Sequence, residues 1–256
     1  MAEIKLMVDG LVKAFGPELP VLDGVSFAVA PGEFVSLVGP SGCGKSTLFN
    51  VIAGLEPPDG GRVLVEGDDA TGRVDPFAYM PQQDLLFPWR TVIDNAALGL
   101  EVAGVRRREA RERAAELFEP FGLAGFERAH PRELSGGMRQ RAALLRTVVQ
   151  DRPVLLLDEP FGALDSLTRT DMQTWLDEVR ARYDWTVLMI THDVREAIYL
   201  SDRVVVLAPR PTSVHREIAV DLPRPRDLDM ITSARFAELE AELLDALRRR
   251  GSNRVG

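Results

Sequence analysis

Hydrophobic residues in this chain gather in short runs that are separated by longer segments of helical pattern. Phe34–Val38, Val154–Leu157 and Thr186–Ile190 are almost entirely apolar, which is typical of strands buried on both faces of a sheet. Val25–Val29 instead alternates between apolar and polar residues and ends at a Pro-Gly turn. We expect additional strands at Arg62–Val65, Phe77–Met80 and Val214–Val220.

Helical patterns fill the spaces between these runs. One helix is expected from about Lys45 to Ala53, where Gly54 stops it, and another from about Asp165 to Arg182. From about Thr91 to Gln150 the chain is mostly helical, with breaks at proline and glycine residues. The alternation of strands and helices predicts a doubly wound α/β core, and the long helical stretch predicts a lobe inserted into that core.

The C-terminal part has a different pattern. The Pro-Arg-Pro-Arg segment at 223–226 is typical of a linker, and a last helix follows it. The residues 248–251, three arginines and a glycine, suit the negative end of a helix and a glycine stop. We interpret this helix as a packing surface, with one apolar face made of Phe236, Leu239, Leu243, Leu244 and Leu247.

Composition narrows the class of protein. The chain has 256 residues, of which 45% are hydrophobic, and its 31 Lys and Arg against 39 Asp and Glu give a net charge of −8. An acidic balance argues against non-specific nucleic-acid binding, which depends on neutralising phosphates; the basic cluster at 106–108 is interpreted as a solvated helix start. The single cysteine excludes an intrachain disulfide and suits a reducing compartment.

No apolar run approaches the ~20 residues that a membrane-spanning helix needs, and the N-terminus lacks the apolar core of a signal peptide. We therefore expect a cytoplasmic protein. If it serves a membrane, it does so through another protein.

The clearest chemical motif is a phosphate loop between an expected strand and an expected helix. It matches G-x-x-x-x-G-K-[ST], in which glycines let successive backbone N–H groups face an anion and the helix start adds positive charge. Lys45 reaches the β- and γ-phosphates of ATP, and Ser46 offers a hydroxyl to Mg²⁺. The expected ATP-binding residues of the loop are Gly39, Pro40, Ser41, Gly42, Cys43, Gly44, Lys45, Ser46 and Thr47.

Two carboxylates follow a buried strand later in the chain. Asp158 and Glu159 come directly after Val154–Leu157, so the strand delivers both to its carboxyl end, where ligands bind in such sheets. Asp158 is a candidate for holding Mg²⁺, and Glu159 for accepting a proton from the attacking water. An apolar strand that ends in Asp is a weak signal alone and a strong one after a phosphate loop.

A third motif, Leu134-Ser135-Gly136-Gly137, lies between the first two. Ser135 is a natural N-cap, and the helix Met138–Gln150 is expected to follow the two glycines, which makes a second anion-binding helix start. The order of phosphate loop, Leu-Ser-Gly-Gly and carboxylate strand resembles the ATP-binding-cassette (ABC) family. The resemblance spans about residues 4–220.

The resemblance implies roles for further residues. Gln82 is similar to the glutamine that contacts Mg²⁺ and senses the γ-phosphate, with Gln83 as the alternative. His192 resembles the switch histidine that contacts the γ-phosphate, and Asp165 lies in a loop that links the two sites of a cassette dimer. Phe15 takes the place of the aromatic residue that stacks on adenine, although most relatives have Tyr there. His130 and His215 are left as structural.

The resemblance also implies an architecture. The chain is identified as a phosphate-loop NTPase with a RecA-like core and mixed sheet (residues 1–88 and 151–222), a helical signature subdomain (89–150) and a short C-terminal helical extension (223–256). It implies a head-to-tail homodimer with composite sites, in which Ser135, Gly136 and Gly137 of one subunit cap ATP held by the other.

Finer details indicate a subgroup. Segments 85–92 and 159–165, and Met138 after the double glycine, resemble ATPases of importers, most of all the nitrate/sulfonate/taurine and pyrimidine-precursor group. Such ATPases sit on the inner face of the cell membrane, with two permease subunits and, indirectly, an extracytoplasmic binding protein. An exporter ATPase, a cassette acting on DNA and a non-hydrolysing assembly module are the alternatives. Cys43 is interpreted as a tolerated small residue rather than a reactive thiol.

Overall fold

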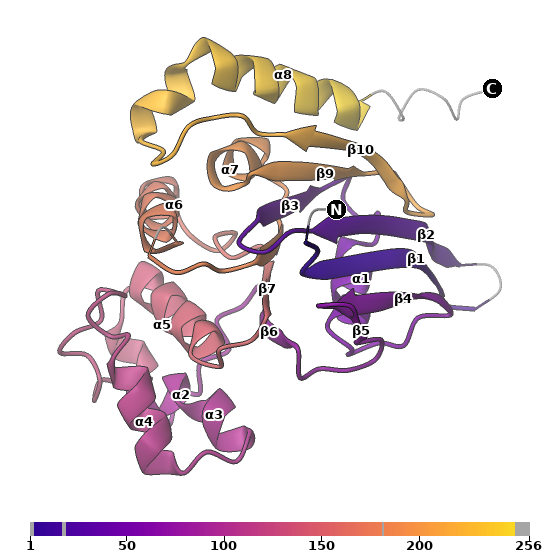
Figure 1. Cartoon of the computed structure of the whole chain (residues 1–256). Helices are drawn as coiled ribbons and strands as arrows, with labels where there is room; N and C mark the ends of the chain where they lie inside the picture. Colours follow the sequence, from indigo (N-terminus) through magenta and orange to yellow (C-terminus); the bar gives the residue numbers. More distant parts are fainter. Residues whose placement is uncertain (1–2, 17–18, 181, 249–256) are drawn as a thin grey trace, which may run out of the picture.

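Two β-sheets and the helices packed on them make up the part of the chain that the computed structural model describes, residues 3–16, 19–180 and 182–248 (Figure 1). The strands are β1 (Leu6–Ala14), β2 (Pro20–Val29), β3 (Phe34–Val38), β4 (Gly60–Val65), β5 (Asp68–Asp69), β6 (Phe77–Met80), β7 (Val154–Asp158), β8 (Val187–Ile190), β9 (Arg203–Leu207) and β10 (Val214–Ala219). The helices are α1 (Lys45–Ile52), α2 (Val92–Ala96), α3 (Leu98–Val102), α4 (Arg107–Ala115), α5 (Gly136–Val148), α6 (Ser166–Arg180), α7 (Val194–Leu200) and α8 (Ala234–Arg248).

The larger sheet is mixed, and its described strands have the order β10-β9-β3-β8-β7-β6. Within it β9, β3, β8, β7 and β6 are parallel to their neighbours, and only the pair β9–β10 is antiparallel. The smaller sheet, with the order β2-β1-β4-β5, is antiparallel. The predicted α/β core with a mixed sheet is confirmed.

The continuous apolar runs are explained by burial on both faces of the larger sheet. In β3, Phe34 and Val38 pack into one hydrophobic cluster with α6, α7 and α8, whereas Val35 and Leu37 pack into a second cluster on the other face. This second cluster fills the space between the two sheets and contains Leu48 and Phe49 of α1. The helix that follows the phosphate loop is therefore anchored by apolar contacts on two sides.

Helices α2 to α5 form the helical part that was expected between residues 91 and 150, at the lower left of Figure 1. It contains fewer helical residues than predicted, because turns and a short 3₁₀ segment occupy residues 116–134. Within this part, Asp94 joins α2 to α4 by accepting hydrogen bonds from Arg107 and Arg111. Arg111 and Thr91 donate hydrogen bonds that outweigh the effect of burial and lower the pKa of Asp94 to about 2.

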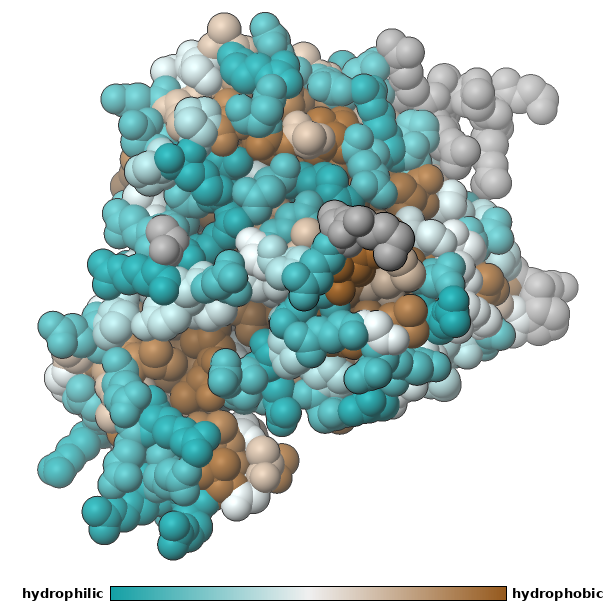
Figure 2. Space-filling view, viewed as in Figure 1, coloured by the Kyte–Doolittle hydropathy of each residue, from teal (hydrophilic) through white to brown (hydrophobic). Residues whose placement is uncertain are grey.

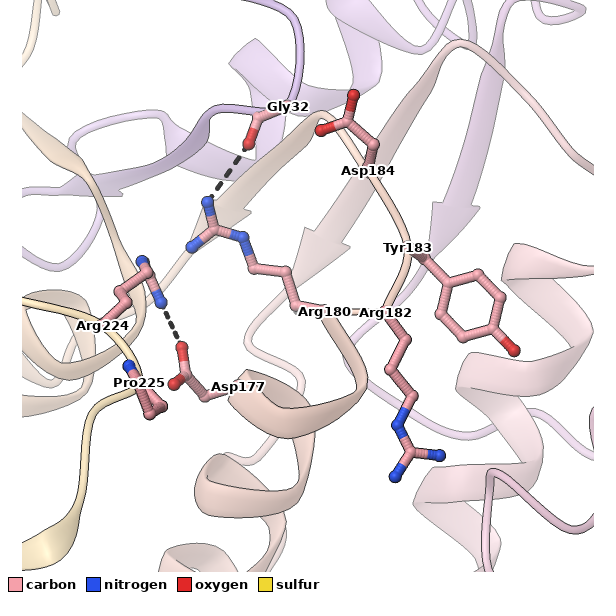
Figure 3. A pocket seen from close by; sticks show the side chains of 8 residues that line it. All are labelled: Gly32, Asp177, Arg180, Arg182, Tyr183, Asp184, Arg224 and Pro225. Atoms are coloured by element: carbon pink, nitrogen blue, oxygen red, sulfur yellow. Dashed lines mark hydrogen bonds and ion pairs between the residues drawn. The ribbon is translucent and has the colours of Figure 1, made fainter.

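The segment 223–226 is not a free linker, which corrects the sequence-based interpretation. Arg224 pairs with Asp177 near the end of α6, beside a cavity that is also lined by Arg180 and Tyr183 (Figure 3). Arg226 is 4% exposed and donates to three backbone carbonyls at the end of α7. The segment therefore closes the carboxyl end of α7, because helix ends leave carbonyls without intrahelical partners.

Helix α8 covers α7, β9 and β10 with an apolar face, as predicted (Figure 1). Its fully buried residues include Phe236, Leu239 and Leu243, whereas Leu244 and Leu247 are half-buried. The predicted helix end at residues 249–251 lies outside the described residues. Within the described ranges, no helix is long and apolar enough to cross a bilayer.

Candidate functional site

Every parallel strand of the larger sheet is followed by a residue of the candidate site. The loop that begins at Gly39 follows β3, Gln82 follows β6, Glu159 follows β7, His192 follows β8 and Arg210 follows β9. Parallel strands present their carboxyl ends at the same edge of a sheet, and ligands bind there in α/β folds. The topology thus brings together residues from five distant segments.

The phosphate loop has the backbone that the glycine spacing predicts. Gly42 and Gly44 have φ values of 71° and 116°, a region that residues with a Cβ rarely occupy. The Lys45 ammonium is buried beneath the loop and donates hydrogen bonds to the carbonyls of Gly39 (2.8 Å) and Pro40 (3.1 Å). The loop therefore curves around the Lys45 ammonium, which is held by two of the loop's own carbonyls.

The connection between β9 and β10, at Thr212, and β2, at Val21, pack against the phosphate loop. The Thr212 hydroxyl donates to the carbonyl of Cys43, and a Cβ on Gly44 would lie 2.8 Å from the side chain of Val21. The Cys43 thiol is 2% exposed and belongs to the apolar cluster between the sheets. This placement supports the packing interpretation of Cys43, because buried thiols in apolar surroundings are inert.

The first carboxylate after β7 is enclosed. Asp158 is 9% exposed, and the Tyr79 hydroxyl donates to its Oδ2 at 3.2 Å. Burial is the largest effect and raises the pKa of Asp158; the Tyr79 hydrogen bond opposes this effect, and the neighbouring Glu159 charge adds to it. Tyr79 was not predicted from the sequence, although its half-buried position on β6 beside β7 is where such a partner must lie.

The second carboxylate is the meeting point of two other predicted residues. Gln82 Nε2 donates to Glu159 Oε2 at 3.0 Å, and His192 Nδ1 lies 3.2 Å from the same oxygen. Glu159 has a φ of 45°, a strained value for a residue other than glycine, and such strain clusters at functional sites. Of the two candidate glutamines, Gln82 is the one that contacts Glu159.

A cavity of about 440 Å³ is bordered by Glu159 and His192, whereas Gln82 and Asp158 are not among the described residues that line it. It is polar and open, and a cation from the β9–β10 connection, Arg210, borders it together with the phosphate loop. Arg210 was not predicted, because a single arginine after a strand carries no local signal. The described residues that line the cavity are Ser41, Gly42, Gly44, Lys45, Ser46, Thr47, Glu159, His192 and Arg210.

The Leu-Ser-Gly-Gly segment lies elsewhere on the subunit. Ser135 is exposed and caps α5 by accepting from the Met138 N–H at 3.2 Å. The helix begins at Gly136 rather than after the glycines, so both glycines belong to its first turn. Gly137 is buried, and a Cβ there would lie 3.0 Å from Thr168 of α6. Among the described lining residues of the cavity, none belongs to this segment.

The remaining predicted residues are dispersed. Asp165 caps α6 by accepting from the Thr168 N–H and hydroxyl, contacts that lower its pKa. Phe15 is half-exposed just beyond β1, with the Lys13 ammonium 5.3 Å from its ring centroid. His130 takes part in a short capping turn with Glu133, and His215 lies on β10, in keeping with structural roles.

The fold and the site together define a phosphate-loop nucleotide-binding protein. A family profile described as "ABC transporter" matches residues 22–162. The chain is 48% identical to an aliphatic sulfonates import ATP-binding protein of Rhodococcus jostii over 89% of this chain and 87% of the relative. It is 41% identical to a formylaminopyrimidine import ATP-binding protein of Halalkalibacterium halodurans, over 92% and 91% of the two chains.

A solved structure agrees with this result. The ATP-binding cassette MJ0796, in a dimeric post-hydrolysis state bound to ADP and Pi, has a TM-score of 0.72 with this chain and is 30% identical, covering 85% of this chain and 100% of the other. The chain belongs to the ABC transporter family, and it is an ATPase of that family. The predicted resemblance, down to sulfonate and pyrimidine-precursor import relatives, is confirmed.

Proposed function

We propose that this chain is the ATP-hydrolysing subunit of an importer that moves a small solute of the sulfonate or pyrimidine-precursor class through a membrane permease. The support is its identity to ATP-binding subunits named for aliphatic sulfonates and for formylaminopyrimidine, over about nine-tenths of the chain. In such a complex the chain sits on the inner face of the membrane, and an extracytoplasmic binding protein delivers the solute to the permease.

In the proposed site, the phosphate loop binds the triphosphate of ATP. Backbone N–H groups of the loop bind the phosphates, Lys45 supplies charge from inside the curve, and α1 contributes its positive end. Phe15 stacks on the adenine from the smaller sheet, a role that its half-exposed ring allows. The division into core (1–88, 151–222), helical subdomain (89–150) and extension (223–256) is part of the same proposal.

The residues around the loop fit a Mg²⁺ ion. Asp158, Ser46 and Gln82 offer carboxylate, hydroxyl and amide oxygens, the hard donors that Mg²⁺ prefers. Asp158 stands at the end of a strand and Ser46 in the first turn of α1, so both are carried by rigid elements. When bound, the ion supplies positive charge to the β- and γ-phosphates.

Glu159 is proposed to act as the general base. Gln82 and His192 both engage Oε2 of its carboxylate, which orients the group beside the cavity. The carboxylate accepts a proton from a water molecule that attacks the γ-phosphate while the bond from that phosphorus to ADP breaks, a step that a positioned base accelerates by about 10²–10⁴-fold. We propose that Gln82 and His192 also contact that phosphate, which would connect its presence to the two loops that carry them.

The observation that carries the dimer is the position of the Leu-Ser-Gly-Gly segment. Ser135 is an exposed helix N-cap, and neither it nor Gly136 or Gly137 is among the described residues that line the cavity. A second anion-binding helix start that lies outside its own nucleotide cavity is suited to a site on another copy. We propose a head-to-tail homodimer in which these residues cap ATP bound by the partner and Asp165 lies near the interface.

An apolar groove of about 590 Å³ is the proposed docking site for a permease segment. It lies between the core and the helical part, with Leu55 and Val74 on one side and Leu98 and Val102 on the other. Val102 is 81% exposed and Leu85 56%, although both are apolar. Figure 2 shows hydrophobic surface around α5 and beside α3, whereas α4 is covered by hydrophilic residues, and exposed apolar patches mark interaction sites. Arg146 ties the connection after Gln82 to α5 by donating to two carbonyls.

The proposal is tested with Glu159→Gln. We expect the variant to bind ATP with wild-type affinity, to lose at least ~100-fold in phosphate release, and to accumulate as an ATP-bound dimer in size-exclusion chromatography. Glu178→Gln, at an exposed position on α6, is the matched control and should behave as wild type. Wild-type turnover by Glu159→Gln would show that the base is assigned wrongly.

The importer assignment is tested with a permease. The chain is purified together with the permease encoded beside it and reconstituted in vesicles, with the binding protein and a sulfonate or a pyrimidine precursor supplied outside. ATP-dependent solute accumulation inside supports import. Efflux instead of uptake would favour an exporter, and ATPase stimulation by DNA would favour a nucleic-acid role.

A further inference from the structure

A buried carboxyl group lies directly behind the switch loop, defined here as Thr191–Asp193. Glu196, in the first turn of α7, is 5% exposed, and its Oε2 accepts a hydrogen bond from the Thr191 hydroxyl at 3.1 Å. The same hydroxyl accepts from the Asp193 N–H at 3.0 Å. The Thr191 hydroxyl thus connects Glu196 to the backbone of Asp193, and the residues on both sides of His192 are held by these two hydrogen bonds.

Arg169 approaches the switch loop from α6. Its Nη2 donates to the carbonyl of Leu164 at 2.9 Å, and its Nη1 lies 3.9 Å from Asp193 Oδ2. Leu164 belongs to the linking loop, defined here as Gly162–Asp165. The side chain of Arg169 therefore spans from the linking loop to the switch loop within one subunit.

Arg169 and Glu196 also share an unsatisfied state. Arg169 Nε and Glu196 Oε1 are both buried, and neither has a hydrogen-bond partner among the described residues. Each of these two groups therefore has the capacity for a further hydrogen bond, which a displacement of α6 relative to the switch loop could satisfy.

Charges around Glu196 come from three elements. Burial raises the pKa of Glu196 to about 8, with Asp193 of its own loop and Glu159 after β7 adding to this effect and Arg169 of α6 opposing it. The carboxyl is therefore mainly protonated at neutral pH. A neutral, hydrogen-bonded group in this place can hold the switch loop without repelling Glu159.

The first turn of α6 also packs against α5, the helix that begins in the Leu-Ser-Gly-Gly segment. A Cβ on Gly137 would lie 3.0 Å from Thr168, the residue before Arg169, and Gln140 donates to the carbonyl of Pro160 just ahead of the linking loop. A second copy that docks on the linking loop or on the Leu-Ser-Gly-Gly segment would press on this turn. Arg169 is the polar side chain that leads from it to the loop of His192.

We propose that Arg169 and Glu196 are positioning residues that couple the linking loop to the switch loop, so that a displacement of the linking loop changes the placement of His192 against Glu159. This inference rests on the proposed roles of His192 and Glu159. Neither Arg169 nor Glu196 borders the described cavity, so both act through the switch loop.

The experiment compares Arg169→Met in two backgrounds. In the wild-type background we expect kcat to fall about 10-fold, while KM for ATP, the affinity for a fluorescent ATP analogue and the Tm change little. In a His192→Ala background, single-turnover phosphate release should fall less than about 2-fold further, because an effect that passes through His192 is lost with it. Arg182→Met, exposed just beyond α6, is the matched control and should leave kcat unchanged.

Conservative variants separate positioning from stability. Arg169→Lys keeps the charge and one set of donors and should recover part of the lost kcat. Glu196→Gln keeps an acceptor for Thr191 and should stay within about 2-fold of wild-type kcat at pH 7, whereas Glu196→Leu should lose about 10-fold.

The inference is overturned if Arg169→Met leaves kcat unchanged in a folded protein, or lowers it by the same factor in both backgrounds. With Glu159→Gln inactive and His192→Ala impaired, such a result removes the coupling and leaves the proposed function intact. A His192→Ala variant with wild-type turnover would remove both the switch assignment and the coupling.

Discussion

The two ends of the nucleotide site are built in different ways. The phosphate loop, residues 39–47, holds its shape through its own backbone: two glycines with positive φ, a helix that starts within it, and the Lys45 ammonium hydrogen-bonded to the carbonyls of Gly39 and Pro40. The switch loop, Thr191–Asp193, is held by side chains outside it, one from the helix that follows and one from α6. Glu196 fastens Thr191, and Arg169 spans from the linking loop to Asp193.

The helix behind the switch loop continues this contrast. The carboxyl end of α7 is closed by Arg224, which donates to the Leu200 carbonyl, and by Arg226, which donates to those of Ile198, Tyr199 and Ser201. Helix α1 behind the phosphate loop is instead anchored by apolar residues in the cluster between the sheets. A locally determined loop suits a rigid cradle, whereas a loop held by remote polar contacts can respond to changes at those contacts.

The largest effect on ATP binding is expected at the locally determined end. Lys45→Ala should weaken ATP binding by about 100-fold, since hydrogen bonds to a charged group contribute about 1.5–3 kcal/mol. Because the loop is shaped mainly by its backbone, the Tm should change by only a few degrees. Titration with a fluorescent ATP analogue measures the affinity, and Lys5→Ala, at an exposed ion pair, serves as the control. Unchanged affinity would contradict the placement of the triphosphate.

At the remotely supported end, the corresponding loss is in stability. Arg226→Met keeps an apolar stem and leaves three carbonyls at the end of α7 without their donor, so the free energy of unfolding should fall by about 3 kcal/mol. Urea denaturation measures the change. Arg235→Met removes only exposed ion pairs and should stay within about 0.5 kcal/mol of wild type. Equal effects of the two variants would remove the contrast between the two ends.

A pH series sharpens the comparison at Glu196. The pKa of Glu196 in the folded protein, about 8, lies above its ordinary value of 4.5. The stabilising contribution of this raised pKa is therefore fully present below pH 4.5 and is lost as pH rises through about 8. Relative to Glu196→Gln, wild type should lose at most about 1.4 kcal/mol per pH unit in this window. Denaturation at pH 5, 6, 7 and 8 measures it, and parallel profiles for the two proteins would show that the carboxyl does not titrate there.

The smallest expected effect is at the Leu-Ser-Gly-Gly segment. Ser135→Ala removes the side-chain acceptor for the Met138 N–H and should cost about 1 kcal/mol of stability. The variant should weaken ATP-dependent dimer formation more than it destabilises the isolated subunit, because the Ser135 hydroxyl is proposed to contact ATP that the partner subunit binds. The same loss in both measurements would restrict Ser135 to helix capping.

Much of the fold was predictable because its signals are local. The apolar runs of β3, β7 and β8 are short, continuous and followed by motifs, so their burial on both faces could be inferred from the chain. The first turn of α5 was placed two residues late, since glycine disfavours helix in isolation. Gly137 packs closely against Thr168, and this tertiary contact favours a helical glycine that local propensity does not predict.

The phosphate loop, the carboxylate pair and the family could be recognised in the chain alone, because each motif that carries them is a contiguous pattern. The contact of Tyr79 with Asp158, the place of Arg210 beside the cavity and the closure of α7 by Arg226 became visible only in the folded protein. These side chains obtain their partners from strands and helices that are distant along the chain, so no local pattern indicates them. A proline- and arginine-rich segment resembles a linker until the helix end that its arginines satisfy is known.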